Sequence, residues 1–101
     1  MRFEWDDEKA RTNLKQHGVS FAEATEVFYD PNALEDYDAA HSDEEKRFFI
    51  IGVSSRRLLY VVYAERAGDV VRIVSARKAD KAERENYERA SNPQTFCLRR
   101  G

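Results

Sequence analysis

Four cations in the second half of the chain are the residues best suited to chemistry. They lie in and around an apolar run of β-branched residues and are Arg66, Arg72, Arg77 and Lys78. An arginine within an apolar strand loses hydration unless it holds an anion, and its planar guanidinium matches the geometry of phosphate. We therefore predict a phosphate-binding site where this strand leads into the following helix. The alternative is that the cations pair with acids of that helix, such as Glu83, or with carboxylates of a partner.

The hairpin that precedes this strand decides which of the cations meet. If residues 68–69 form a two-residue loop, Glu65 faces Arg72 and Arg66 lies on the opposite face. An ion pair between Glu65 and Arg72 would then contribute roughly 0.2–1 kcal/mol. If Ala67 joins the loop, the pairing slips by one residue, and Arg66 shares a face with Arg72. The sequence leaves both registers open.

Tyr87 and the two histidines are further candidates. Tyr87 lies on the helix face that can fold back over the sheet, where a core tyrosine with a satisfied hydroxyl is the default interpretation. An acid–base or base-stacking role requires that Tyr87 neighbours Arg77. His17 directly precedes Gly18, so we predict that it lies at a helix C-terminus. His41 lies in a loop rich in acids, where we expect it to be exposed.

Metal chemistry is not expected. The two histidines lack carboxylates at ligand spacing. The acids at positions 36, 38 and 43–45 do not form the loop pattern of a calcium site. A lone Cys97 excludes an internal disulfide and a cysteine-based metal cage, and we interpret it as an incidental thiol. We predict no metal and no cofactor.

Periodicity and capping patterns predict the elements that position these side chains. An acidic first turn and Gly18 predict a helix over residues 7–17, with Ala10, Leu14 and His17 on its apolar side. Ser20 opens a second helix that ends at residues 30–32. Strands are predicted over 33–38, 47–53, 57–65 and 70–76, and a third helix, introduced by Asp80 and Glu83, over about 81–90. Adjacent hairpins make the sheet antiparallel.

The predicted fold class is therefore α+β, with two N-terminal helices, a three- to four-stranded antiparallel sheet and a C-terminal helix. With 101 residues the chain has room for one domain, placed at 1–91, and we read 92–101 as a tail. The sequence lacks an apolar run of membrane length and an apolar signal segment, so we expect a cytoplasmic protein. Residues 1–50 carry a net charge of −7 and residues 51–101 a net charge of +5, which favours a basic working surface beside an acidic one, or a partner of mixed charge.

Four separated segments of the chain match one known family in the same order. They run from Phe3 to about Tyr87 and read FEWDDEKARTNLKQHGVSFAEA, FYDP, FIIGVS and RIVSARKADKAERENY. These segments resemble the BrnT toxins of type II toxin–antitoxin systems. The resemblance implies a RelE-like fold and a metal-independent endoribonuclease that inhibits translation. It also implies neutralisation by a BrnA-like antitoxin, a toxin–antitoxin heterotetramer, and operator DNA contacts made mostly by the antitoxin.

The resemblance also assigns roles to residues. In enzymes of this kind the RNA 2′-hydroxyl attacks the adjacent phosphate, while side chains move protons and arginines hold the phosphorane. The expected catalytic residues are Arg66, Arg72 and Arg77 as phosphate clamps, Tyr87 as a proton-transfer or stacking group, Glu65 as general base and His17 as acid. The expected RNA-binding residues are Lys78, Lys81 and Arg84. The alternative function is a non-catalytic binding module, either a ParE-like inhibitor of a protein target or a degenerate toxin that serves as a co-repressor subunit.

Overall fold

A computed structural model describes residues 1–38 and 46–91. His41, the acids at 43–45, Cys97 and the predicted tail at 92–101 therefore lie outside the described residues. The described helices are α1 (Asp7–His17), α2 (Phe21–Glu26), the 3-10 turn Val27–Tyr29 and α3 (Lys81–Ser91). The described strands are β1 (Arg2–Glu4), β2 (Leu34–Tyr37), β3 (Arg47–Val53), β4 (Leu58–Arg66) and β5 (Val70–Lys78). The predicted α+β class is confirmed.

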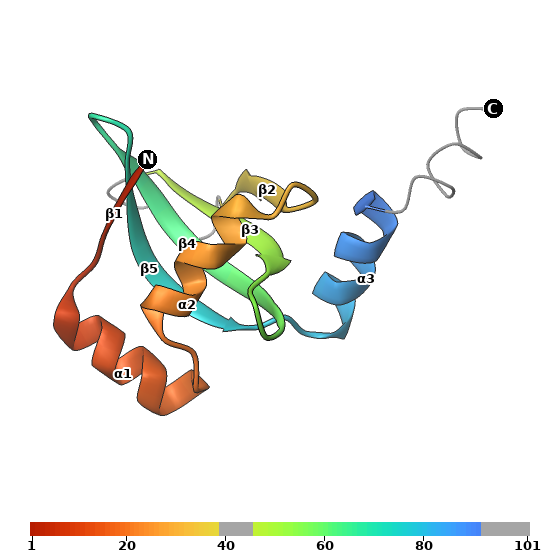
Figure 1. The fold of residues 1–101 in the computed structure, drawn as a ribbon, viewed down its shortest axis with the longest axis horizontal. Helices are drawn as coiled ribbons and strands as arrows, with labels where there is room; N and C mark the ends of the chain where they lie inside the picture. Colours follow the sequence, from red (N-terminus) through yellow and green to blue (C-terminus); the bar gives the residue numbers. More distant parts are fainter. Residues whose placement is uncertain (39–45, 92–101) are drawn as a thin grey trace.

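The strands form one mixed sheet in the order β1-β5-β4-β3-β2 (Figure 1). β1 pairs parallel to β5, with Phe3 opposite Val71, and the other pairings are antiparallel. The predicted antiparallel pairing is confirmed for β2, β3, β4 and β5, whereas the fifth strand, β1, and its parallel pairing were not predicted. β1 has only three residues, too few for a periodic pattern, and its partner lies at the other end of the chain.

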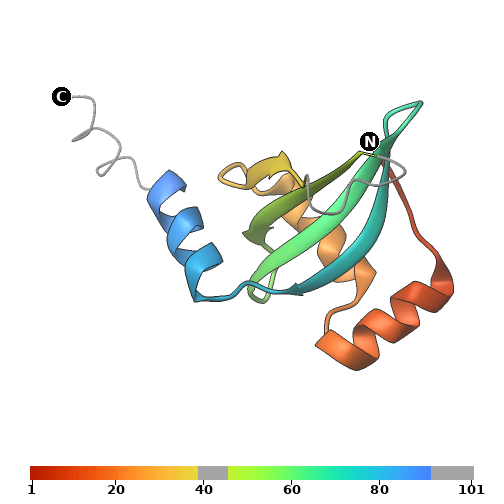
Figure 2. The same ribbon diagram turned by 180° about the vertical axis from the view of Figure 1, so that it is seen from behind.

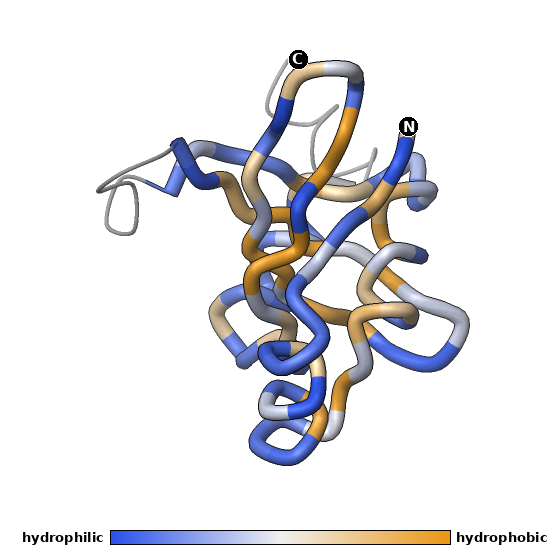
Figure 3. Tube along the Cα trace, turned by 90° about the vertical axis from the view of Figure 1, so that its left-hand side faces the viewer, coloured by the Kyte–Doolittle hydropathy of each residue, from blue (hydrophilic) through white to orange (hydrophobic). Residues whose placement is uncertain are grey.

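The helices lie at two different places around the sheet. Helices α1 and α2 cover one face, whereas α3 projects beyond the ends of the strands (Figures 1 and 2). Figure 3 shows hydrophobic stretches running through the strands. The core lies between the sheet and the first two helices, and its largest fully buried side chains include Phe21, Leu59, Ile73 and Val27. None of the helices in the described ranges is long and apolar enough to cross a membrane.

The buried side of helix α1 differs from the apolar side that the sequence predicted. Leu14 is 52% exposed and His17 is exposed, whereas Asn13 is buried. The Asn13 amide donates to the carbonyl of Ala76 (2.8 Å) and accepts from its N–H (3.0 Å). It also donates to the carbonyl of Val19 (2.9 Å). β1 ends before it reaches Ala76, so a side-chain amide satisfies backbone groups that a longer strand would have paired.

The helix termini follow the predicted caps with one exception. Gly18 adopts the left-handed conformation (φ 69°) that ends α1. At α3 the capping box is complete, since Glu83 N–H donates to Asp80 (2.8 Å) and Asp80 N–H donates to Glu83 (2.9 Å). At α2 only half of the box forms, because the Ser20 hydroxyl accepts from the Glu23 N–H while the Glu23 carboxylate turns to Arg57.

Candidate functional site

The β4–β5 hairpin and a β-bulge place three arginines on one face of the sheet. Arg66 pairs with Val70 across a three-residue loop, so Arg66 and Arg72 share a face, as the second predicted register requires. Val74 has no partner on β4 and forms the bulge, since Tyr63 pairs with Ile73 and Val62 with Ser75. The extra residue brings Arg77 to the same face as Arg72. Without it, two positions five residues apart on a strand would point to opposite faces.

These arginines do not form a single cluster. Arg66 lies at the hairpin end of β4, while Arg77 pairs with Tyr60 at the other end. At about 3.3 Å per residue the two positions are roughly 20 Å apart. The Glu65–Arg72 ion pair that a two-residue loop would allow does not form, because Glu65 lies opposite Val71. Arg72 instead pairs with Glu4 of the unforeseen strand β1 at 3.1 Å.

Arg77 holds the junction between β5 and α3. Its guanidinium donates two parallel hydrogen bonds to the Glu83 carboxylate, at 2.8 and 2.7 Å. It also lies over the Tyr60 ring, 4.2 Å from the centroid, which is cation–π geometry. The carboxylate of Glu83 raises the pKa of Arg77 above its ordinary value despite partial burial, so the guanidinium stays charged. The alternative prediction, that Arg77 binds Glu83, therefore describes this structure.

The other predicted RNA-binding residues surround this junction without converging on one point. Lys78 lies opposite Leu59, a residue of the core, so its side chain lies on the other face of the sheet from Arg77. Lys81 and Arg84 belong to α3, and like Lys78 they are exposed. The end of β5 and the start of α3 thus carry several accessible positive charges within a short stretch of chain.

Tyr87 anchors α3 to the body of the protein. Its hydroxyl donates to the Asp30 carboxylate at 2.7 Å, and the same carboxylate accepts from the N–H groups of Val53 and Asn32. Burial raises the pKa of Tyr87 to about 12, and the bond to Asp30 adds to the shift. For Asp30, burial raises the pKa, but the hydrogen bonds from Tyr87 and the two N–H groups outweigh it and lower the value overall. The Tyr87 hydroxyl is thus satisfied by Asp30, and Arg77 contacts Glu83, the Tyr60 ring and the carbonyl of Lys78.

A groove separates α3 from the turn between β3 and β4. Its volume is about 390 Å³, and its walls include Ser55, Arg56, Arg84, Tyr87 and Glu88. Arg56 was not singled out from the sequence, where it belongs to a turn between two predicted strands. The Asp-Pro pair at positions 30–31 predicted the end of a helix, but not that Asp30 would receive Tyr87.

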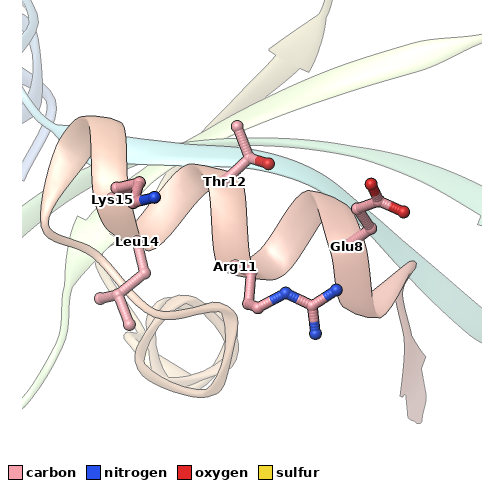
Figure 4. A pocket seen from close by; sticks show the side chains of 5 residues that line it. All are labelled: Glu8, Arg11, Thr12, Leu14 and Lys15. Atoms are coloured by element: carbon pink, nitrogen blue, oxygen red, sulfur yellow. The ribbon is translucent and has the colours of Figure 1, made fainter.

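The remaining predicted residues lie elsewhere. His17 lines a shallow hollow beside β5 with Val74 and Ser75, and Glu65 is exposed near the hairpin. The hollow of about 400 Å³ on the outer surface of α1 is lined by Glu8, Arg11, Thr12, Leu14 and Lys15. Figure 4 shows these side chains projecting in different directions rather than toward a common centre. Within residues 1–38 and 46–91, no group of three or more His, Cys, Asp or Glu side chains could hold a metal ion.

Comparison with known proteins identifies the family. The family model for the ribonuclease toxin BrnT of type II toxin–antitoxin systems matches residues 5–83 of this chain. The chain belongs to the BrnT family. The crystal structure of the Brucella abortus ribonuclease toxin BrnT is similar in fold, with a TM-score of 0.61 and 24% sequence identity. The match covers 80% of this chain and 99% of the Brucella BrnT chain, and it fits a RelE-like fold. A comparison with curated proteins found no match.

Some of the candidate residues lie inside the range of the family match, and others lie beyond its end. Arg66, Arg72 and Arg77 lie inside the matched range, as do Lys78 and Lys81. Arg84 and Tyr87 lie beyond its end at residue 83, so the BrnT match does not extend to them. The BrnT resemblance read from the sequence, from Phe3 to about Tyr87, thus begins two residues before the family match and ends about four residues after it.

Proposed function

We propose that this BrnT-family protein is a metal-independent endoribonuclease that inhibits translation and is neutralised by a BrnA-like antitoxin. The family match over residues 5–83 is the observation that carries this proposal. The placement of Arg77 adds to it, since a guanidinium at the end of the sheet, backed by an aromatic ring and flanked by exposed cations, suits a phosphodiester.

In the proposed reaction the RNA 2′-oxygen attacks the adjacent phosphorus as its proton passes to a base. The bond from phosphorus to the 5′-oxygen breaks, and that oxygen takes up a proton from an acid. Arg77 stabilises the charge that develops on the phosphorane. The scissile phosphate takes the place of Glu83 as the bidentate partner of the guanidinium. Arg72 and Arg66, farther along the same face, contact the RNA backbone outside the cleavage point. Glu65 and His17 as general base and acid remain predictions, as does proton transfer by Tyr87.

The proposal extends to the setting in which the toxin acts. We place the toxin domain at residues 1–91, treat 92–101 as a tail and assign the protein to the cytoplasm. The antitoxin forms a heterotetramer with the toxin and makes most of the operator DNA contacts. The acidic first half of the chain is suited to receive basic segments of the antitoxin.

The test is digestion of a defined single-stranded RNA in EDTA by the wild type and by Arg77→Ala. We expect Arg77→Ala to reduce cleavage by about 100-fold or more, as for loss of one donor to a developing oxyanion. Arg11→Ala, which removes an exposed cation from α1, is the matched control and should retain activity. Equal cleavage by Arg77→Ala and wild type would overturn the assignment of the site.

The second candidate function is a non-catalytic binding module. The observation that favours it is that two groups assigned to the chemistry already serve structural contacts, Arg77 with Glu83 and Tyr87 with Asp30. On this reading the folded protein cleaves neither free RNA nor ribosome-bound messenger RNA, yet its expression alone still arrests growth. Cleavage of either RNA by the wild type would reject it.

A further inference from the structure

The groove between the β3–β4 turn and α3 carries two arginines that the proposed catalytic centre does not use. Arg56 lies on the turn and Arg84 on α3, and both line the same hollow of about 390 Å³. Both are exposed. Within residues 1–38 and 46–91, neither guanidinium makes a hydrogen bond or a contact ion pair. Two charged side chains from distant parts of the sequence therefore face the same space with their donors available.

The neighbouring arginine shows that the turn does not need Arg56 for its own structure. Arg57 donates to both carboxylate oxygens of Glu23 and to the carbonyl of Gly18. The Ser54 hydroxyl accepts from the backbone N–H of Arg56 and of Arg57 and so fixes the turn. The charge of Arg56 contributes slightly to lowering the pKa of Glu23, but its guanidinium remains in solvent.

The opposite wall of the groove is held in place by its own contacts. Tyr87 contributes to that wall and is tied to Asp30, which also binds the N–H of Val53 at the end of β3. On the turn side, the Ser55 N–H donates to Glu26 at 2.7 Å. Both walls are thus anchored to α2 and the segment that follows it, so the groove is formed before any ligand enters.

The charge of the lining selects the class of ligand. Arg57 is neutralised by Glu23, which leaves Arg56 and Arg84 against a single carboxylate, Glu88. Two guanidinium groups beside serine hydroxyls and a tyrosine ring suit a phosphodiester chain with stackable bases. The family match ends at residue 83, so the α3 wall of this groove, with Arg84, Tyr87 and Glu88, lies beyond the matched range.

We propose that this groove binds the backbone of single-stranded RNA and extends the substrate path from Arg77 around α3. The inference rests on the proposed ribonuclease function and adds a second contact region to it. Arg56 and Arg84 act as phosphate contacts, and Glu88 weakens binding by repulsion. The groove thereby increases affinity for RNA longer than the segment that Arg77 alone can hold.

The test measures the salt dependence of binding to a short 2′-O-methyl single-stranded RNA, which lacks the nucleophilic hydroxyl and stays intact. We expect the double variant Arg56→Ala/Arg84→Ala to reduce the slope of log affinity against log salt by about 1.4, roughly 0.7 per lost contact. The double variant Arg11→Ala/Lys15→Ala removes the same charge from α1 and should leave the slope unchanged. Glu88→Gln should increase affinity at low salt. Circular dichroism melting checks that each variant is folded.

The outcomes separate this inference from the proposed function. A smaller slope for the groove variant alone supports the groove as an RNA site. Equal slopes for the groove and control variants, with Arg77-dependent cleavage intact in the wild type, would overturn the groove and leave the nuclease standing. Loss of antitoxin binding by the groove variant, with RNA binding unchanged, would reassign the groove to a protein partner. A wild type that neither binds nor cleaves RNA would overturn both.

Discussion

Two bidentate arginine–glutamate pairs lie at different depths in the part of the chain that the structure describes. Arg57 and Glu23 join at 2.9 and 3.0 Å, and their side chains are 25% and 8% exposed. Arg77 and Glu83 join at 2.8 and 2.7 Å, and their side chains are 37% and 15% exposed. The bond geometry is nearly the same, so the difference between the pairs lies in their surroundings.

Those surroundings give the two pairs different roles. The Arg57–Glu23 pair connects segments 34 residues apart and includes further hydrogen bonds to Ser54 and Gly18. The Arg77–Glu83 pair spans six residues and closes the turn into α3. A local, more exposed pair is the one whose carboxylate a phosphate can replace without disrupting the core. The geometry of a bidentate arginine–glutamate pair alone therefore does not show whether the pair serves stability or ligand binding.

Removing the deeper carboxylate should produce the largest effect on stability. We expect Glu23→Gln to lower the free energy of unfolding by about 3 kcal/mol, because it leaves a partly buried guanidinium without its counter-charge. Urea denaturation at neutral pH measures the change. Glu85→Gln, which alters an exposed carboxylate of α3, is the control. Equal losses in Glu23→Gln and in Glu83→Gln, which removes the carboxylate of the shallower pair, would remove the distinction between the pairs.

Acid should weaken the deeper pair in a predictable direction. The hydrogen bond from Arg57 lowers the pKa of Glu23 below 4.5, outweighing the opposing effect of burial, and Ser54 adds to the lowering. The stabilisation is fully present above the unfolded-state pKa and is lost as pH falls through the lower folded value. As the pH falls below the ordinary glutamate pKa of 4.5, the wild type should therefore lose more stability than Glu23→Gln. Parallel pH profiles of the urea midpoint would contradict this.

Removing the hydrogen bond that anchors α3 should have an intermediate effect on stability. Tyr87→Phe removes the hydrogen bond to Asp30 and should cost about 1 kcal/mol, expressed mainly as faster amide exchange in α3. If Tyr87 serves only as an anchor, RNA cleavage at saturating substrate stays close to wild type. A loss of 100-fold or more in a folded variant would instead assign Tyr87 to proton transfer, since that is the scale of acid–base catalysis.

The shallower pair should give the smallest change in stability but a gain in RNA binding. Glu83→Gln keeps the shape of the capping side chain and removes its charge, so unfolding should change by less than about 1 kcal/mol. RNA affinity should rise roughly twofold to fivefold, because the competing ion pair is worth about 0.5–1 kcal/mol. Titration with 2′-O-methyl RNA measures the gain. A fall in affinity would show that Glu83 positions Arg77 for RNA rather than competing with it.

Local sequence patterns predicted most helices and strands of this fold. The contacts between residues far apart in the sequence could not be predicted. Gly18 and the Asp80–Glu83 box act within one helical turn, so their residue types alone indicate the helix ends. The pairing of β1 with β5 and the burial of Asn13 depend on residues far away in the chain. A polar residue in the middle of α1 was the available signal for Asn13, since asparagine there is unfavourable without a partner.

The candidate site was predictable in its residue types but not in its assembly. The sequence identified Arg77 and Lys78 at the strand–helix junction, and the structure places both there. It could not show that the Val74 bulge would align Arg77 with Arg72, or that the arginines would spread along the sheet. Arg56 was missed because the sequence does not distinguish it from the adjacent Arg57. Only the structure shows that Glu23 forms its ion pair with Arg57.

The amide of Asn13 and the strand β1 have a consequence for the order of folding. Both complete the sheet along β5, and Asn13 meets Ala76 across 63 residues of chain. Contacts of such high sequence separation close slowly, because the intervening chain must first be ordered. The N-terminal segment therefore leaves the ribosome long before its partner strand is made. We expect the β3–β4 hairpin to form early in synthesis, and the first residues translated to be among the last to reach their native contacts.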